Sequence, residues 1–86
     1  MFQLNKDFRL TSSNEGSVIL DLKSGKYMRL NRSGKTVLES LLENGTIETC
    51  IIQLSQQYPT TSVHRIQKDV ENLTNELLAQ RVIEKI

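Results

Sequence analysis

The sequence has few of the residues from which catalytic and metal-binding sites are built. Its 86 residues include one cysteine, one histidine, one proline and no tryptophan. A lone cysteine excludes a disulfide within the chain, and a zinc site built on Cys50 and His64 would have to recruit two carboxylates. No apolar run approaches the ~20 residues of a membrane span, and the N-terminus lacks a signal-peptide core. We therefore expect a cytoplasmic protein that has no metal, no cofactor and no membrane partner.

An excess of charge of one sign is also missing. Eleven basic residues face ten acidic ones, which leaves a net charge of +1. Such a balance gives no electrostatic reason to bind nucleic acid or anionic lipid. With 37% hydrophobic residues, the chain has the composition of a globular protein, and its length predicts one small domain spanning residues 1–86.

Apolar and polar residues alternate in three segments of the first third of the chain, which predicts strands at 7–11, 17–22 and 26–30. In the middle segment the alternation puts Val18, Leu20 and Leu22 on one face. Lys23-Ser24-Gly25 fits a three-residue hairpin loop with Gly25 in the left-handed conformation, and residues 12–16 fit a turn of the same kind. Together these segments predict a three-stranded antiparallel meander with one apolar face.

From Asn31 onward the apolar residues follow helical spacing and predict three helices. Asn31 or Ser33 caps the first helix, which stops at Asn44-Gly45 with Gly45 as a left-handed cap. Thr46 caps the second helix, and Pro59 ends it. The third helix opens at Thr61 or Ser62, and residues 82–86 form either a last helical turn or a short strand. The predicted class is α+β, in the order βββααα.

Isolated motifs do not make a catalytic site. Ser33-Gly34-Lys35-Thr36 matches the end of a phosphate-binding loop, but Arg29 stands where that motif needs its first glycine. Cys50 lies on the apolar stripe of the second helix, where a buried inert thiol is expected. His64 is expected on the surface of the third helix, beside Arg65. We therefore expect no enzymatic activity.

The last two helices also permit an alternative hypothesis, a small winged-helix DNA-binding protein. Residues 57–62 would be the turn of a helix-turn-helix, and the first turns of the following helix offer plausible base and phosphate contacts: His64, Arg65, Gln67 and Lys68. The same helix carries Asp69, Glu71 and Glu76, and DNA-binding domains of this size are usually basic. Nucleic acid is therefore not the expected partner.

Several segments, taken in order, resemble one known family. They are Val-Ile-Leu-Asp-Leu at 18–22, Gly-Lys-Tyr-Met-Arg-Leu-Asn at 25–31, Ser-Gly at 33–34, Val-Leu-Glu-Ser-Leu at 37–41, Ile-Ile-Gln-Leu at 51–54, Tyr-Pro at 58–59, and Asp69-Val70 followed by Leu73 and Leu77-Leu78. Over residues 8–83 the chain resembles PqqD-like proteins, the recognition elements for ribosomally made precursor peptides. It is most similar to the stand-alone leader-binding proteins of lasso-peptide pathways. One departure is Gln80-Arg81, where many members have a glycine that ends the third helix.

This resemblance implies a winged-helix-like βββααα domain that has no catalytic activity. Family members bind the leader segment of a precursor as an added strand in a groove walled by the third helix. They deliver it to a processing enzyme, a leader peptidase in lasso pathways or a radical enzyme in the quinone-cofactor pathway. Carried onto this chain, the resemblance implies a peptide-binding set on the third strand and third helix: Lys26, Tyr27, Met28, Arg29, Leu30, Ile66, Asp69, Val70, Leu73 and Leu77. Val70, Leu73 and Leu77 could each equally be ordinary core.

Overall fold

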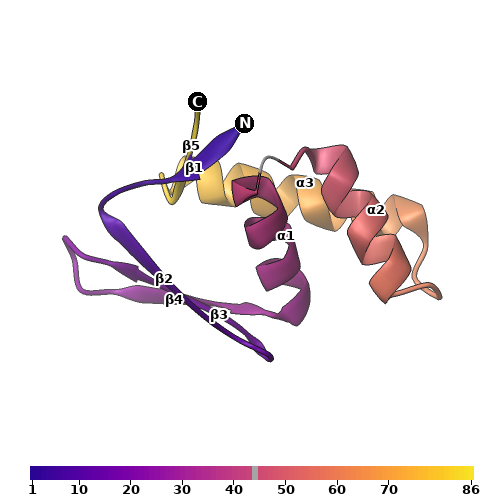
Figure 1. The fold of residues 1–86 in the computed structure, drawn as a ribbon, viewed down its shortest axis with the longest axis horizontal. Helices are drawn as coiled ribbons and strands as arrows, with labels where there is room; N and C mark the ends of the chain where they lie inside the picture. The colour runs from indigo at the N-terminus through magenta and orange to yellow at the C-terminus, as the bar shows by residue number, and fades with distance from the viewer. Residues whose placement is uncertain (44) are drawn as a thin grey trace.

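Five strands and three helices make up the computed structural model, which describes residues 1–43 and 45–86. Figure 1 shows a sheet at one end, α1 standing against it, α2 beyond α1, and α3 running behind α1 from beside α2 to β5. The elements are β1 (Phe2–Leu4), β2 (Phe8–Ser13), β3 (Gly16–Asp21), β4 (Tyr27–Asn31), α1 (Arg32–Leu42), α2 (Ile47–Gln57), α3 (Val63–Ala79) and β5 (Ile83–Lys85). The α+β class and the three helices are confirmed. The order βββααα is incomplete, because a strand precedes the meander and another follows the helices.

The two additional strands tie the ends of the chain together. β1 pairs antiparallel with β5, so that Phe2 lies opposite Lys85 and Leu4 opposite Ile83. The tail is thus a strand, one of the two alternatives left open by the sequence. The chain reverses into it at Arg81, whose φ of 61° lies in the left-handed region. The Val82 N–H donates to the Leu77 carbonyl at 2.9 Å and the Arg81 N–H to the Leu78 carbonyl at 3.1 Å, which is the Schellman pattern of a helix end.

The larger sheet has the order β2-β3-β4, with both pairs antiparallel. Gly25 adopts a φ of 75°, as predicted for the β3–β4 loop. That loop begins at Leu22, one residue earlier than predicted. The last hydrogen bond between the two strands runs from the Asp21 N–H to the Lys26 carbonyl at 2.8 Å. The β2–β3 turn, by contrast, is shorter than predicted, since Ser13 pairs with Gly16 and leaves only Asn14 and Glu15 between the strands.

The middle strand presents the opposite face to the core from the one its alternation indicated. Ile19 is 1% exposed, whereas Val18 is 37% exposed. Leu10 and Met28 lie opposite Ile19 on the two neighbouring strands, so the face of Ile19 is apolar across the whole sheet. The run 18–20 is apolar on both faces, and only the flanking strands decide which face is covered.

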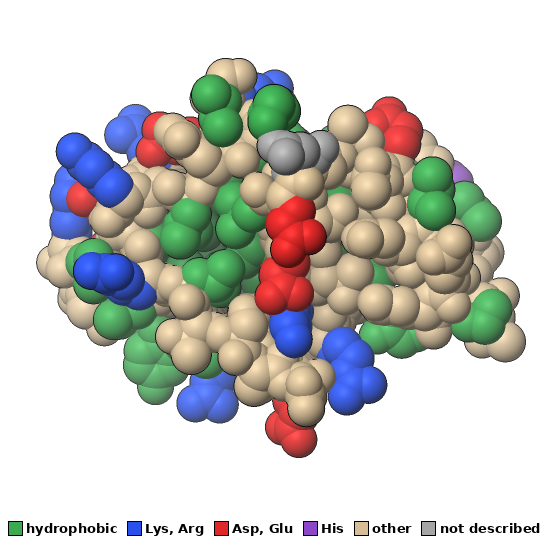
Figure 2. Space-filling view, in the orientation of Figure 1, with side chains coloured by type: hydrophobic (Ala, Val, Ile, Leu, Met, Phe, Trp, Pro, Cys, Tyr) green, Lys and Arg blue, Asp and Glu red, His purple; other side chains and the backbone are tan. Residues whose placement is uncertain are grey.

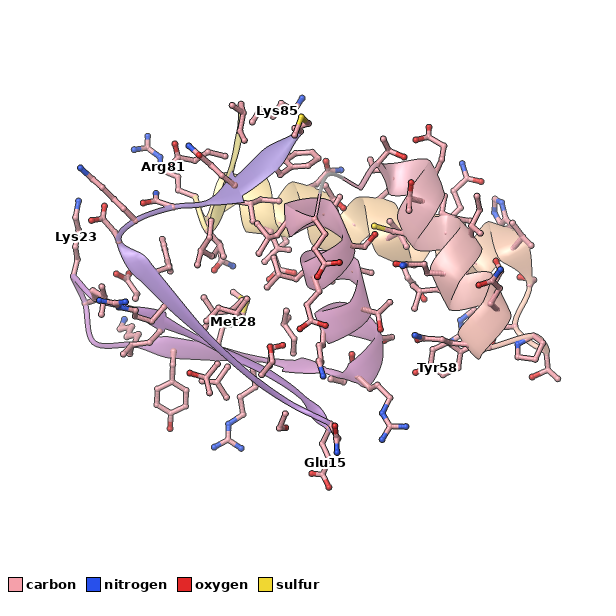
Figure 3. All side chains as sticks on the ribbon, in the orientation of Figure 1. Glu15, Lys23, Met28, Tyr58, Arg81 and Lys85 are labelled. Carbon is pink, nitrogen blue, oxygen red and sulfur yellow. The ribbon has the colours of Figure 1, made fainter. Side chains whose placement is uncertain are left out.

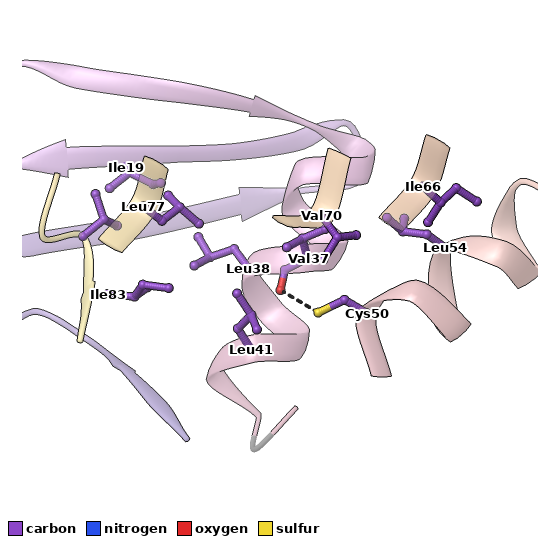
Figure 4. Close-up of a cluster of buried hydrophobic side chains, with 11 residues drawn as sticks. Ile19, Val37, Leu38, Leu41, Cys50, Leu54, Ile66, Val70, Leu77 and Ile83 are labelled. Atoms are coloured by element: carbon purple, nitrogen blue, oxygen red, sulfur yellow. Dashed lines mark hydrogen bonds between the residues drawn. The ribbon is translucent and has the colours of Figure 1, made fainter. Parts of the chain in front are cut away.

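The inner face of the sheet and the three helices enclose one core. Figure 4 shows Ile19 and Ile83 at one end of the cluster, near Leu77 of α3 and Leu38 of α1, and Cys50 and Leu54 of α2 at the other end. The buried set is Ile19, Val37, Leu38, Leu41, Cys50, Leu54, Ile66, Val70, Leu77, Val82 and Ile83. No helix within residues 1–43 and 45–86 has both the length and the apolar character needed to cross a membrane.

Side-chain caps fix where each helix begins. Asn31, rather than Ser33, caps α1 by accepting the Gly34 N–H at 2.9 Å. Thr46 caps α2, and Ser62, rather than Thr61, caps α3. At the end of α1 the Gly45 N–H donates to the Ser40 carbonyl at 2.8 Å. Asn44, the other half of the predicted stop, lies outside the described residues. The φ angle of Gly45 is defined in part by an Asn44 atom, so the left-handed conformation predicted for Gly45 stays a prediction.

The helix end at Arg81 carries a backbone conformation that costs a non-glycine residue about 1 kcal/mol. Replacing Arg81 with glycine should therefore raise the free energy of unfolding by about that amount, measured by urea denaturation. Arg81→Ala is the control, because it removes the side chain but keeps the Cβ. If Arg81→Ala stabilises the protein as much as Arg81→Gly, the strain lies in the side chain and not in the backbone.

Candidate functional site

A groove separates the free edge of β4 from α3. β4 has β3 on one side only, and no strand of residues 1–43 and 45–86 lies along its other edge. The groove measures about 470 Å³ and draws its lining from β4 and from all three helices: Arg29, Leu30, Asn31, Ser33, Gly34, Val37, Leu54, Asp69, Val70 and Leu73. An extended peptide laid here would meet a strand edge on one side and a helix on the other.

The hydrogen bonds of the hairpin decide which backbone groups of β4 face the groove edge. The Asp21 N–H donates to the Lys26 carbonyl, so the main-chain groups of residue 26 point toward β3. Main-chain groups alternate in direction along a strand. The groups of Met28 and Leu30 therefore also face β3, and those of Tyr27 and Arg29 face the open edge. These two residues provide the donors and acceptors that an added strand would use.

The side chains of β4 divide between two faces. Met28 and Leu30 are half-buried on the inner face, and Figure 3 shows Met28 pointing from β4 toward the helices. Tyr27 is 62% exposed on the outer face, with the Arg29 guanidinium 5.9 Å from the centre of its ring. The strand thus offers apolar contact on its inner face and an aromatic and a cationic group on the other.

The α3 wall contains residues of two kinds. Ile66 and Val70 are 4% and 0% exposed and belong to the core as well as to the groove lining. Leu73 is half-buried and Asp69 is exposed, so these two present their side chains to the groove. Leu77, which the sequence placed in the same set, is fully buried against the sheet and lines none of the hollows along β4. The other nine residues of the predicted set line the groove or its continuations.

Two further hollows continue the groove along β4. One, of about 430 Å³, lies toward the α2–α3 turn and brings in Tyr58 and Arg65. The other, of about 300 Å³, lies at the start of β4 and is lined by Phe8, Met28 and Val82, among others. Each hollow has one basic and one acidic residue in its lining, Arg65 and Asp69 toward the start of α3 and Lys26 and Asp21 at the start of β4.

Sequence patterns missed the contributions from the first turn of α1 and from α2. Asn31, Ser33 and Gly34 line the groove where the chain turns from β4 into α1, and Leu54 reaches it from α2. Of these residues only Gly34 stands out in the sequence, as a glycine at the start of a predicted helix. The structure gives its reason, since a Cβ at this position would lie 3.1 Å from the Leu30 Cβ. A larger side chain at Gly34 would crowd the groove floor.

Neither of the reactive side chains considered from sequence lines the groove. The Cys50 thiol is buried, with its Sγ 3.7 Å from the Val37 carbonyl oxygen. Burial raises the pKa of this thiol, which keeps it neutral and unreactive near pH 7. His64 is exposed on α3. Over the described residues, 1–43 and 45–86, no three His, Cys, Asp or Glu side chains are grouped to hold a metal ion.

The different burial of Leu73 and Leu77 predicts different stability losses on truncation. Leu77→Ala should lower the free energy of unfolding by about 2–5 kcal/mol, because it leaves a cavity in a packed core. Leu73→Ala should cost less than half as much, because its side chain already meets solvent in the groove. Urea denaturation of the two variants measures this difference. Equal losses would place Leu73 in the core and remove it from the groove.

Comparison with known proteins identifies the family of the chain and proteins of similar fold. Residues 16–83 match the family model described as Coenzyme PQQ synthesis protein D (PqqD). The fold is similar to that of "TbiB1 in Complex with the TbiA(beta) Leader Peptide" (17% identity, TM-score 0.83, covering 98% of this chain and 96% of the other). It is also similar to "Lasso peptide synthetase B1 complexed with the leader peptide" (21% identity, TM-score 0.85, 98% of both chains). No curated protein matches the sequence. The resemblance found in the sequence is confirmed: the chain belongs to the PqqD family.

Proposed function

We propose that the chain is a non-catalytic adaptor that binds the leader segment of a ribosomally made precursor peptide by strand addition. The observation that carries the proposal is the open β4 edge, with the backbone groups of Tyr27 and Arg29 directed into a groove walled by α3. The fold similarity to two proteins described as leader-peptide complexes supports the same function.

The groove suits a disordered peptide that becomes ordered on binding. Main-chain hydrogen bonds to β4 give affinity that does not depend on sequence, and alternate side chains of the peptide enter the groove and give specificity. Ordering a flexible segment costs free energy, so apolar anchors have to be buried to offset it. Leu30, Val70 and Leu73 form the apolar surface for such anchors. Arg65 and Asp69 bind charged leader side chains at one end and fix the register.

The captured leader is presented to a separate maturation enzyme. Among the described residues, the groove is lined by no cysteine or histidine, and the Ser33 hydroxyl donates to the Asn31 side chain and not to a general base. We therefore infer that cleavage or modification of the peptide requires a partner. We infer a leader peptidase of a lasso-peptide pathway as that partner, on the strength of the fold similarity to the two B1 proteins, and a radical enzyme as the alternative. The adaptor and its enzyme would meet in the cytoplasm.

A winged-helix DNA-binding function has weaker support. The exposed face of α3 mixes Arg65 and Lys68 with Asp69 and Glu71, and Gln67 donates to the Glu71 carboxylate at 3.1 Å. A recognition helix needs an amide free to reach base edges and a cationic surface toward the phosphates. Peptide binding gives the open edge of β4 a function, whereas DNA binding through α3 does not involve that edge.

Strand addition predicts that the Arg29 N–H, and not only its side chain, contributes to leader binding. Arg29→Pro removes this outward donor without breaking a β3–β4 hydrogen bond. Losing one hydrogen bond is worth about 1 kcal/mol, so the Kd for the leader should rise about fivefold beyond that of Arg29→Ala. The measurement is a fluorescence titration with a labelled synthetic leader.

Arg29→Ala is the matched control because it loses the same side chain and keeps the N–H. Circular dichroism melting of both variants verifies that the sheet remains folded. Equal affinities of folded Arg29→Pro and Arg29→Ala would contradict strand addition at this edge. Failure of the unaltered protein to bind its leader at all would contradict the proposed function itself.

A further inference from the structure

The outer face of the β2–β3–β4 sheet, turned away from the helices, carries exposed apolar side chains. The strand registers place eight side chains on it: Arg9, Thr11, Ser13, Val18, Leu20, Tyr27, Arg29 and Asn31. Val18 is 37% exposed, Tyr27 is 62% exposed, and Leu22 at the end of β3 is 48% exposed. A shallow hollow of about 290 Å³ opens beside Thr11, Val18 and Arg29. Apolar side chains gathered on one exposed face mark an interaction surface.

The charges on the outer face are all of one sign. Within residues 8–13, 16–21 and 27–31, the outward positions carry Arg9 and Arg29 and no carboxylate. Figure 2 shows Lys and Arg side chains at the left with acidic ones among them, and further acidic side chains lined up near the centre, over α1. A second copy of the chain docked here by two-fold symmetry would bring arginines together, which is unfavourable. A nucleic acid would leave Val18 and Leu20 without apolar contacts. The complementary surface is apolar with carboxylates, on a folded protein.

We propose that the outer face docks the enzyme that acts on the captured peptide, through an apolar surface bearing Asp or Glu side chains; this inference rests on the proposed function. A strand added at the β4 edge continues the same sheet, and its alternate side chains extend the outer face. An enzyme seated there contacts the adaptor and the peptide at once. It therefore binds the loaded adaptor more tightly than the empty one, and by linkage the peptide binds more tightly when the enzyme is present.

Arg9 and Val18 test this surface, because neither lines the groove. The probe is the purified leader peptidase of the same biosynthetic pathway, immobilised for surface plasmon resonance with the adaptor injected alone or saturated with synthetic leader. Arg9→Glu combined with Val18→Thr reverses one charge and removes apolar contact while keeping a β-branched residue in the strand. This variant should bind the peptidase at least about tenfold more weakly and bind the leader within about twofold of the unaltered protein.

The matched control is Lys85→Glu combined with Val63→Thr. Lys85 lies on β5, away from the larger sheet (Figure 3), and Val63 is 57% exposed at the start of α3. The control should keep both affinities.

Unchanged peptidase affinity of the Arg9/Val18 variant, with leader binding intact, overturns the proposal. A peptidase that binds the loaded adaptor no more tightly than the empty one overturns it as well. The proposal is also overturned if the unaltered protein self-associates or binds DNA under the same conditions and the Arg9/Val18 variant loses that binding instead. Loss of leader binding by the unaltered protein would be a failure of the proposed function.

Discussion

The junction between β4 and α1 at Asn31 is the constraint on which the candidate site depends. Asn31 is the last paired residue of β4, opposite Gly16, and its side chain caps α1. With no linker between strand and helix, α1 has to leave β4 directly and pack over the inner face of the sheet. α1 covers the inner face and leaves the free edge of β4, on the side away from β3, open. The fit is tight, since a Cβ at Gly16 would stand 2.1 Å from the Leu30 carbonyl oxygen.

The far wall of the groove is held at both of its ends. Ser62 caps the start of α3, and the Schellman turn at Arg81 leads from its end into β5. β5 then pairs with β1, which connects the end of α3 through Asn5 to the strand that begins the larger sheet. α3 therefore cannot move freely relative to β4. A groove of fixed width loses little conformational entropy when a peptide enters, and this favours affinity.

Sequence patterns predicted the features that depend on local chemistry. The cap at Thr46, a cap at Thr61 or Ser62 and the left-handed Gly25 follow from short-range hydrogen bonding and steric limits. The structure has caps at Thr46 and Ser62 and a left-handed Gly25. β1 was missed because its three residues are too few to show alternation and their partners lie at the other end of the chain. The inward face of β3 and the division between Leu73 and Leu77 were also beyond local reasoning. Both depend on which surface another element covers.

An amide chemical-shift titration with the precursor's leader shows whether β4 and α3 form the peptide groove. The backbone amides of residues 27–31, together with those of Asp69 and Leu73, should shift, while Glu48 and Gln53 on α2 stay unchanged. Shifts confined to the turn at residues 57–62 and to residues 64–68, with β4 unmoved, would contradict the account and point to the helix-turn-helix surface.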